Sequence, residues 1–322
     1  MEIGKLTSEL LNKHVFEPLR ELPKRPETKL RPGPGEDCAV LDFSGEVLLS
    51  ADPITGAAED IGYLAVHVNA NDIAASGGEP VGIMLTVLLP PASASECEAA
   101  LAEIMSGAIR AAKEVNIDLL GGHTEVTDAV TRPVVSAAII GKAAKAVATS
   151  GAVPGNALVM TKYAGLEGTV IITKERAETA KRLGVFESAV ARASEISILR
   201  EAAIAAEFAS AMHDITEGGV LGACYELAEA SGTGVLLELD EVPLLDETVI
   251  LCREFGLDPY ALISSGCLLI AAEDGDGLAD RINKAGIPAR VIGKITEKER
   301  QYKKGGVLYE LPPPMSDEIY KL

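Results

Sequence analysis

Residues 46–141 alternate short apolar runs with segments of helical periodicity, and this order restricts the fold more than any other feature of the chain. The run "EVLLSAD" predicts a strand that ends at Asp52, a helix over 60–76 follows it, and "VGIMLTVLLP" predicts a second strand. A long amphipathic helix, which opens with Ser95 and Glu98 in the spacing of a capping box, leads to two further strands, "IDLLGG" and "PVVSAAIIG". The order β-α-β-α-β-β predicts helices layered on one face of a sheet.

The chain changes character at "ATSGAVPGNALVMTK" (148–162), where glycines and prolines form a turn-rich joint before a new strand. A length of 322 residues is enough for about two domains of ordinary size. We therefore predict an N-terminal domain over 1–149 and a C-terminal domain over 150–322. The second mixes Ala-rich helices over 175–210 with strands at "GVLLEL", "GCLLIAA" and "ARVIG".

Composition excludes several classes of protein. Apolar residues make up 48% of the chain but aromatic residues only 4%, so the core must be aliphatic. A formal net charge of −19 disfavours nucleic acid and anionic membranes as partners, although a divalent cation can reverse the sign locally and admit a nucleotide. No apolar run approaches the roughly 20 residues of a membrane span, and no signal peptide is recognisable, so we expect a cytoplasmic protein. The five cysteines are scattered without a C-x-x-C pair, which predicts reduced, mostly buried thiols.

The helix predicted over 60–76 places an acidic residue on its apolar stripe. Ile61, Ala65 and Val68 recur at the spacing i, i+4 and i+7, which marks a face turned towards a core. The next position on that stripe is Asp72. A lone ionised carboxylate in an apolar setting costs several kcal/mol unless something compensates its charge. Asp72 is therefore expected to face a compensating group.

Three more aspartates occupy unusual positions. Asp37 follows a Gly/Pro-rich loop, Asp52 closes an apolar strand, and Asp214 precedes "ITEGGV". Each alone is typical of a turn or cap residue. Together with Asp72 they would repel one another at one site unless a hard cation such as Mg²⁺ lies among them. Mg²⁺ held by a few carboxylates and completed by substrate phosphate is typical of ATP chemistry.

The stretch "LLGGHTEVTD" offers a neighbour for the phosphates. Gly121 and Gly122 directly after a strand let backbone N–H groups approach an anion, and Thr124 offers a hydroxyl, although a plain turn explains the glycines equally well. His123 lies inside this predicted turn. Thr216 is placed to cap the helix that follows "DITEGG". No Walker-type phosphate loop, dinucleotide fingerprint, nucleophile elbow or H-E-x-x-H motif is present.

Six motifs in fixed order resemble one superfamily, that of aminoimidazole ribonucleotide (AIR) synthetase and the AIR synthase related proteins. They are "GEDCAV" (35–40), "SADPITG" (50–56), "NDIAASGGEP" (71–80), "GGHTEV" (121–126), "MHDITEGGV" (212–220) and "ISSGCLLIA" (263–271). The overall sequence pattern is most similar to that of the hydrogenase-maturation (hydrogenase expression/formation) branch. The resemblance implies an α/β N-terminal domain whose sheet joins a dimeric β-barrel, and an α+β, ferredoxin-like C-terminal domain.

The same resemblance implies that ATP and Mg²⁺ are the cofactors and that the chain is a homodimer. Carried over by motif, the predicted Mg²⁺ ligands are Asp37, Asp52, Asp72 and Asp214. The residues that resemble the phosphate neighbours of the family are Gly121, Gly122 and Thr124, and those that would orient the ligands are Asn71 and Thr216. His123 is the one candidate for a catalytic group.

The activity implied is transfer of the γ-phosphoryl group of ATP to an oxygen of a small molecule or a protein carboxamide. Two departures keep other functions open. No cysteine follows Cys267, whereas the maturation enzyme ends in a cysteine that carries its carbamoyl group, and Glu217 stands where that branch usually has arginine. One alternative is therefore a non-catalytic, ATP-binding maturation factor that contacts a partner protein. A third is a thiamine-monophosphate kinase.

Overall fold

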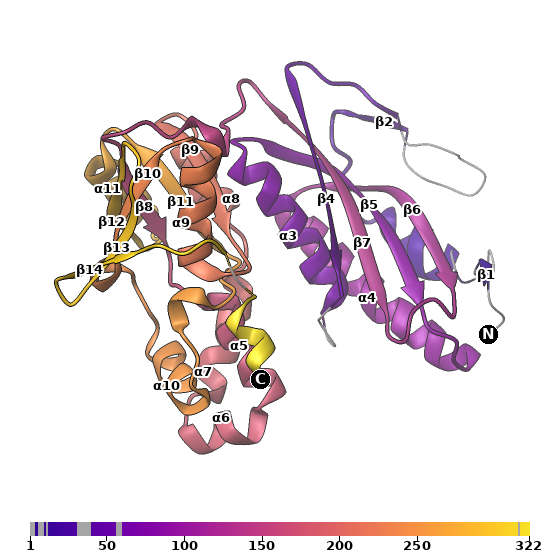
Figure 1. The fold of residues 1–322 in the computed structure, drawn as a ribbon. Helices are drawn as coiled ribbons and strands as arrows, with labels where there is room; N and C mark the ends of the chain where they lie inside the picture. The colour runs from indigo at the N-terminus through magenta and orange to yellow at the C-terminus, as the bar shows by residue number, and fades with distance from the viewer. Residues whose placement is uncertain (1–3, 6–9, 11, 31–39, 56–59, 315) are drawn as a thin grey trace. The chain divides into compact units, whose positions relative to one another are not determined.

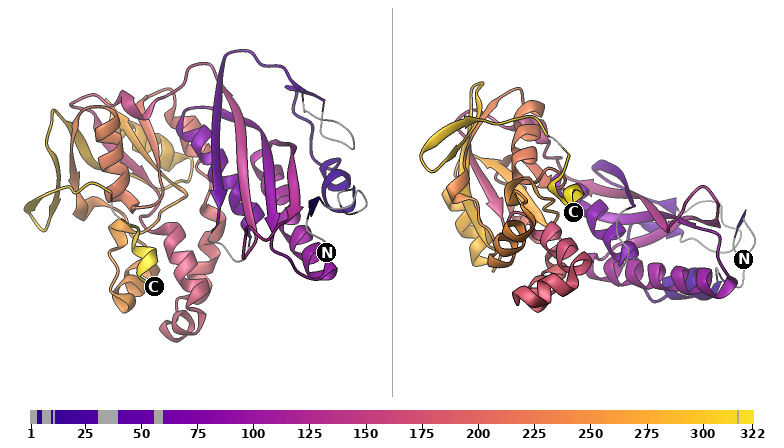
Figure 2. Two further views of the ribbon diagram at one scale, coloured as in Figure 1. Left: turned by 45° about the vertical axis from the view of Figure 1, so that its right-hand side comes forward. Right: turned by 60° about the horizontal axis from the view of Figure 1, so that its bottom comes forward.

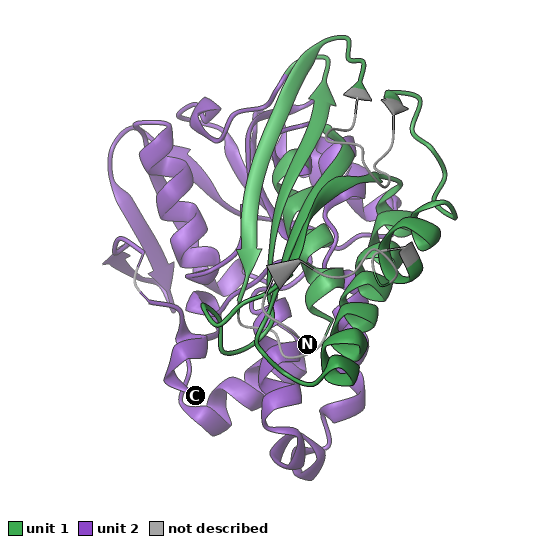
Figure 3. Ribbon diagram, turned by 90° about the vertical axis from the view of Figure 1, so that its right-hand side faces the viewer, with its two compact units in different colours: residues 1–73, 78–145 green, residues 74–77, 146–322 purple. Residues whose placement is uncertain are grey.

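The computed structural model describes residues 4–5, 10, 12–30, 40–55, 60–314 and 316–322. The chain divides into two compact units (Figure 3). Unit 1 comprises residues 1–73 and 78–145, and unit 2 comprises residues 74–77 and 146–322. The domain boundary between residues 149 and 150 stays a prediction. Asp37 and Cys38 lie outside the described residues.

Unit 1 is built on a five-stranded mixed sheet in the order β1-β6-β5-β7-β4 (Figure 1). Its strands are β1 (Gly4–Lys5), β4 (Glu46–Ile54), β5 (Glu79–Leu89), β6 (Asp118–Val126) and β7 (Val134–Ala143). Helices α3 (Ile61–Ala75) and α4 (Ala94–Val115) pack against each other so closely that a Cβ on Gly62 would meet the carbonyl of Ile104. Both helices lie on the same face of the sheet (Figure 2). The predicted β-α-β-α-β-β order is confirmed.

The segment before β4 forms smaller elements: the π-helical turn η1 (Asn12–Phe16), α2 (Glu17–Leu19), and a two-stranded sheet of β2 (Thr28–Leu30) and β3 (Val40–Leu41).

Helix α4 begins two residues earlier than its predicted capping box. The Oγ of Ser93 accepts a hydrogen bond from the backbone N–H of Glu96, and the Glu96 carboxylate accepts one from the backbone N–H of Ser93. The box predicted at Ser95 and Glu98 is therefore wrong. The Glu98 carboxylate instead accepts a hydrogen bond from the ammonium of Lys13, which lies in η1.

Unit 2 contains a seven-stranded mixed sheet in the order β14-β13-β10-β12-β8-β11-β9. The strands are β8 (Ala157–Thr161), β9 (Ala209–Ile215), β10 (Gly234–Glu238), β11 (Cys267–Ala272), β12 (Ala289–Thr296), β13 (Arg300–Lys304) and β14 (Val307–Glu310). The helices are α5 (Leu166–Glu175), α6 (Ala177–Leu183), α7 (Phe186–Ala191), α8 (Leu199–Ala205), α9 (Gly219–Ala230), α10 (Asp246–Phe255) and α11 (Gly275–Lys284). Strands β9, β13 and β14 have no counterpart in the sequence prediction.

Helices cover both faces of this sheet, because successive residues of its strands enter different cores. Leu158 and Met160 of β8 pack with α9, whereas Val159 packs with α8 and α11. A third apolar cluster, which includes Ile172, Leu251 and Leu262, holds α5 and α10 together. The ferredoxin-like description stays a prediction; a mixed α/β unit is what the structure supports.

The predicted state of the thiols is confirmed where the structure describes it. Cys97, Cys224, Cys252 and Cys267 are each buried and free. Burial raises the pKa of Cys252 and Cys267 to about 12, which keeps both thiols protonated and unreactive at neutral pH. Within the described residues, no helix is both long enough and apolar enough to cross a membrane.

Candidate functional site

Ser50 and Asp72 join β4 to α3 in unit 1. The Oγ of Ser50 donates a hydrogen bond of 2.6 Å to Oδ2 of Asp72. On the predicted stripe of α3, Ile61 and Ala65 are buried, but Val68 and Asp72 are half-buried. Asp72 therefore lies at the border of the core, facing a polar group of β4. Carboxylates that bind metal are themselves usually hydrogen-bonded in this way, so the arrangement fits a cation ligand.

Asn69 ties the same helix and strand together one turn earlier. Its Oδ1 accepts a hydrogen bond of 2.9 Å from the backbone N–H of Asp52, and its Nδ2 donates to the carbonyl of Ala65 at 2.9 Å. The Asn69 side chain is fully buried. Alternate residues of a strand share a face, so Ser50 and Asp52 both point towards α3. The structure thus brings Asp52 and Asp72 to the same strand–helix contact.

Two details of this contact differ from the sequence interpretation. Strand β4 continues to Ile54, so the prediction that it ends at Asp52 is wrong. The outer face of β4 stays apolar beyond Asp52, since it carries Leu49, Ala51 and Pro53. The polar residues Ser50 and Asp52 belong to the face turned towards α3, so they interrupt the apolar run without ending the strand. Asn69 and Ser50 were not among the predicted site residues. No pattern in the sequence singles out Asn69, because His67, Asn71 and Asp72 of the same helix are also polar.

The predicted phosphate neighbours Gly121 and Gly122 lie inside β6, and the prediction of a turn there is wrong. Both residues have positive φ, +132° and +144°. A Cβ on Gly122 would lie 1.8 Å from the carbonyl oxygen of Leu85 in the neighbouring strand. The close approach of β5 therefore requires glycine at position 122, whether or not Gly122 also lies near a phosphate.

The residues after the two glycines lie near the edge of the sheet. Among the described strands, β1 pairs with β6 only at Glu125 and Val126. Thr124 is half-buried, and His123 is exposed with its Nε2 3.2 Å from Oε2 of Glu125. On α3, Asn71 is 1% exposed. The roles of Thr124, His123 and Asn71 towards a nucleotide stay predictions.

Asp214 lies in unit 2, near the end of edge strand β9, and is 9% exposed. Its backbone pairs with Leu268 of β11. The predicted N-cap at Thr216 is wrong, because α9 begins after Gly218, whose φ is +80°. The Thr216 carbonyl instead accepts hydrogen bonds from the N–H groups of Gly219 (3.1 Å) and Ser264 (3.3 Å). The sequence does place the glycines correctly at the start of the helix.

The last residues of the chain supply contacts to this turn that no sequence pattern indicates. The backbone N–H of Gly218 donates a 2.7 Å hydrogen bond to Oδ2 of Asp317. The hydroxyl of Tyr320 donates a 2.8 Å hydrogen bond to Oε1 of Glu217, and this bond raises the pKa of Tyr320. About a hundred residues separate the partners, so only the fold reveals the contact.

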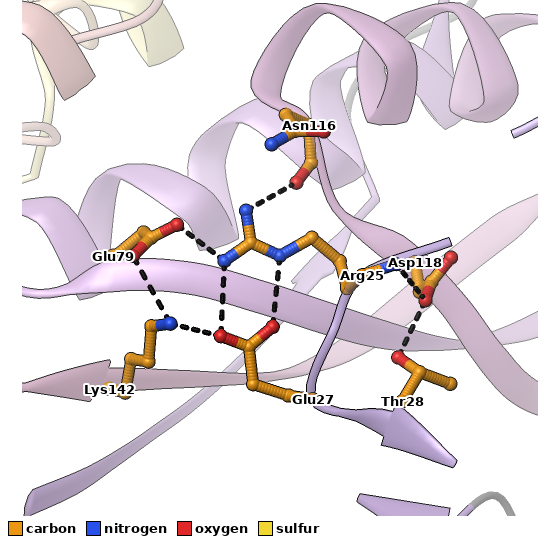
Figure 4. A network of polar contacts seen from close by, with 7 residues as sticks. All are labelled: Arg25, Glu27, Thr28, Glu79, Asn116, Asp118 and Lys142. Atoms are coloured by element: carbon orange, nitrogen blue, oxygen red, sulfur yellow. Dashed lines mark hydrogen bonds and ion pairs between the residues drawn. The ribbon is translucent and has the colours of Figure 1, made fainter. Parts of the chain in front are cut away.

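A network of ion pairs fastens the N-terminal segment of unit 1 to its sheet (Figure 4). The guanidinium of Arg25 contacts the carboxylates of Glu27 and Glu79, and Lys142 of β7 contacts both of these carboxylates. Asp118 accepts hydrogen bonds from the Arg25 backbone N–H at 3.1 Å and from the Thr28 hydroxyl at 2.6 Å. The network therefore fixes the residues that lead into β2.

The charges of this network compensate one another despite their burial. Burial alone would raise the pKa of Glu27, but the hydrogen bond from Lys142 and the charge of Arg25 outweigh it and lower that pKa. Burial also opposes the charge on Arg25, and the carboxylates of Glu79 and Glu27 raise its pKa in spite of it. The charged forms of Arg25, Glu27 and Lys142 are all favoured by these contacts, which is why the buried pair of Arg25 and Glu27 is tolerated here.

The predicted metal site is brought together only in part. Asp52 and Asp72 share the contact of β4 with α3, Asp214 belongs to unit 2, and Asp37 falls in a stretch that is not described. Within the described part of the chain, no group of three or more His, Cys, Asp or Glu side chains is arranged to hold a metal ion. The set of four ligands therefore stays a prediction.

Family models match both halves of the chain. The model for the N-terminal domain of AIR synthase related proteins matches residues 35–143, and the model for the C-terminal domain matches residues 153–304. The chain belongs to the AIR synthase related family. The resemblance carried by the six motifs is thereby confirmed, and the pair of domain models accounts for the two-unit fold.

Relatives in the hydrogenase-maturation branch of the AIR synthase related family share about a quarter of their residues with this chain. A hydrogenase expression/formation protein of Methanocaldococcus jannaschii is 27% identical over 286 residues, which are 82% of this chain and 81% of that protein. The carbamoyl dehydratase HypE of Cupriavidus necator is 25% identical over 296 residues, 85% of this chain and 80% of that protein.

Solved structures show the same fold. The crystal structure of HypE of E. coli, a hydrogenase maturation protein, matches with a TM-score of 0.80 at 22% identity, over 98% of this chain and 99% of that one. A HypE structure in complex with ATP matches with a TM-score of 0.79 at 20% identity, over 98% and 97% of the two chains. A HypE–HypF complex and a thiamine-monophosphate kinase of Stenotrophomonas maltophilia also share it, with TM-scores of 0.71 and 0.73.

Proposed function

We propose that this chain is an ATP- and Mg²⁺-dependent phosphotransferase or dehydrating ligase. It would transfer the γ-phosphoryl group of ATP to an oxygen of a small molecule or of a protein carboxamide. The observation that carries the proposal is the hydrogen bond between Ser50 and Asp72, which places an oriented carboxylate beside Asp52. The likeness to HypE, which has been solved with ATP, supports ATP as the nucleotide.

In this proposal the predicted ligands of Mg²⁺ are Asp37, Asp52, Asp72 and Asp214. The ion would supply positive charge for the β- and γ-phosphate oxygens. Ser50 holds the Asp72 carboxylate in one orientation, and Asn69 fixes the backbone of Asp52 against α3. Backbone N–H groups at Gly121 and Gly122 and the hydroxyl of Thr124 would lie near the phosphates, while Asn71 and Thr216 would orient the ligands. His123 is the candidate for a group that moves a proton.

The outer face of the unit 1 sheet supports the proposed homodimer. Val47, Leu49 and Met84 are 47%, 75% and 49% exposed, although all three are large and apolar. The strand register sets Leu49 beside Ile140 in one row across this face, and Met84 belongs to the next row. An apolar face of this kind is typical of an interface. A second copy of the chain, joined sheet to sheet as in the expected dimeric barrel, is the proposed occupant.

Two other functions are each favoured by a specific observation. A non-catalytic, ATP-binding maturation factor is favoured by the likeness to HypE, which has been solved in complex with HypF. A thiamine-monophosphate kinase is favoured by the shared fold of that enzyme. Formation of thiamine diphosphate from thiamine monophosphate would identify the kinase, and Mg–ATP binding without turnover would identify the factor.

The decisive experiment compares thermal unfolding with and without Mg–ATP. A ligand at 100 times its dissociation constant stabilises the folded state by about 2.7 kcal/mol. For 322 residues that unfold together, that free energy corresponds to an increase in Tm of roughly 4 °C. The Asp72→Asn variant should lose the increase yet keep its fold, because an asparagine oxygen can still accept the hydrogen bond from Ser50.

The matched control is Asp280→Asn, which removes the same charge from an exposed position on α11. This variant should keep the full response to Mg–ATP. Wild-type protein that neither binds Mg–ATP nor releases ADP in the presence of a pool of small-molecule acceptors would refute the proposal. A response that survives in Asp72→Asn would show that Asp72 is no ligand.

A further inference from the structure

The last described residues of the chain return to the turn that follows Asp214. The turn η6 (Glu318–Lys321) and the residue before it, Asp317, lie in unit 2 beside α5 and α10 (Figure 1). The match to the family model for the C-terminal domain ends at residue 304, before this segment. We call residues 317–322 the C-terminal strap.

The strap holds two successive residues of the turn between β9 and α9. Gly218 donates its backbone N–H to Oδ2 of Asp317 at 2.7 Å, and Glu217 accepts the hydroxyl of Tyr320 at 2.8 Å. One contact therefore fixes the backbone, and the other fixes a side chain. On its other side the turn is held by the 3.3 Å hydrogen bond from the N–H of Ser264 to the carbonyl of Thr216.

The strap is itself held in place by contacts with its own backbone and with the rest of unit 2. Asp317 is 2% exposed, and its Oδ1 accepts the backbone N–H of Ile319 at 2.8 Å. Oε2 of Glu318 accepts the backbone N–H of Asp258 at 3.1 Å. Ile319 and Leu322 pack against the apolar cluster of α5 and α10. Two buried carboxylates and two apolar side chains therefore hold the strap to unit 2.

The turn has an intrinsic need for such support. Gly218 and Gly219 both have positive φ, +80° and +60°, and α9 has no N-cap side chain of its own. Glycines leave the backbone free to adopt other conformations, and the first N–H groups of a helix need an acceptor. The carboxylate of Asp317 supplies that acceptor from a distant part of the chain.

We propose that Asp317 and Tyr320 are positioning residues of the nucleotide site, which hold the turn of Thr216–Gly219 so that Asp214 and Thr216 meet Mg–ATP in a fixed arrangement. The inference rests on the proposed function, because Asp214 and Thr216 are site residues only within it. Neither Asp317 nor Tyr320 need touch the nucleotide. Glu217, which precedes the two glycines of the turn, has its partner in the strap.

The test measures Mg–ATP affinity by calorimetry and amide hydrogen exchange of residues 214–222 in the nucleotide-free protein. Asp317→Ala removes the acceptor for Gly218. It should weaken Mg–ATP binding about three- to tenfold, as expected for the loss of one hydrogen bond. It should also speed exchange in this segment about tenfold, because the turn opens locally. Asp317→Asn keeps one acceptor oxygen but turns the other into an NH2 donor that faces the N–H of Gly218 or Ile319, so it should restore only part of both.

Two further variants separate positioning from folding. Tyr320→Phe removes one hydroxyl from a side chain that is 67% exposed, so it should leave Tm unchanged and still weaken Mg–ATP binding about threefold. Glu310→Gln, on exposed strand β14, removes a charge away from the turn and should change neither readout.

The outcomes distinguish this inference from the function on which it rests. If wild-type protein binds Mg–ATP and Asp317→Ala binds it equally well or more tightly, the positioning role is refuted and the function stands. If Asp317→Ala exchanges its amides at the wild-type rate, the strap does not hold the turn. Wild-type protein without affinity for Mg–ATP would refute the proposed function itself.

Discussion

Replacing Lys162 by methionine should be among the most damaging changes in unit 2. Its ammonium donates to the backbone carbonyls of Glu195 (3.0 Å), Ser197 (2.6 Å) and Gly266 (2.7 Å), and it lies 2.7 Å from Oε1 of Glu201. The two side chains are 9% and 2% exposed. Removing one partner of a buried ion pair costs about 3–5 kcal/mol, because the other charge stays buried without compensation. Three carbonyls also lose a donor, so we expect the upper part of that range.

Urea unfolding followed by far-UV circular dichroism measures this loss, provided the slope m is unchanged. The double variant Lys162→Met/Glu201→Leu should recover part of the stability, since it removes the buried carboxylate but leaves the carbonyls without their donor. Lys181→Met is the control: its ion pair with Glu178 is 55% and 93% exposed, and its loss should cost under about 1 kcal/mol. A loss below about 1.5 kcal/mol for Lys162→Met, or a double variant no more stable than the single one, would refute this reasoning.

Two further changes test other parts of the fold. Gly122→Ala should destabilise unit 1 by at least about 3 kcal/mol in the same assay, because its Cβ meets the carbonyl of Leu85 and its φ is positive, whereas Gly184→Ala, also at positive φ but in open space, should cost only about 1–2 kcal/mol. Burial raises the pKa of Glu167 above its ordinary value of 4.5, so the folded state binds a proton that the unfolded state releases. The contribution of the protonated Glu167 carboxyl to stability is therefore fully present below pH 4.5, its ordinary pKa. That contribution is lost as the pH rises through the raised pKa of the folded state. Glutamine cannot ionise, so the Glu167→Gln variant should not show this loss. Between pH 5 and pH 8, the urea midpoint of the variant should therefore rise relative to that of the wild type.

The order of strands and helices in unit 1 could be predicted because each element carries its own pattern. Strand β5 is an apolar run, and α4 buries one stripe of its surface, so both are recognisable without knowledge of their partners. Strands β9, β13 and β14 carry no comparable run. Strand β14 is only four residues long, and β9 intersperses serine, histidine and aspartate among its apolar residues, so neither has a run long enough to recognise.

The candidate site was predictable only where its residue types stand out locally. Asp72 is conspicuous because it interrupts an apolar stripe, and the structure places it against Ser50. Gly122 is equally conspicuous, but the sequence cannot distinguish a turn from the close approach of a neighbouring strand. Its positive φ and its proximity to Leu85 identify the second reason. Asn69, by contrast, could not be predicted as a site residue. Its role depends on a backbone N–H in β4, and no pattern in the sequence of α3 specifies that partner.

The hydrogen bond from Tyr320 to Glu217 links the matched C-terminal domain to the segment that follows it. The predicted nucleotide ligands all fall within the matched residues. Glu217 is inside that match, yet its hydrogen-bond partner Tyr320 is outside it. Under the proposed function, this pair lies next to Thr216 in the turn that would meet Mg–ATP. Variants of Glu217 and Tyr320 should therefore be included when the proposed phosphoryl acceptor is sought.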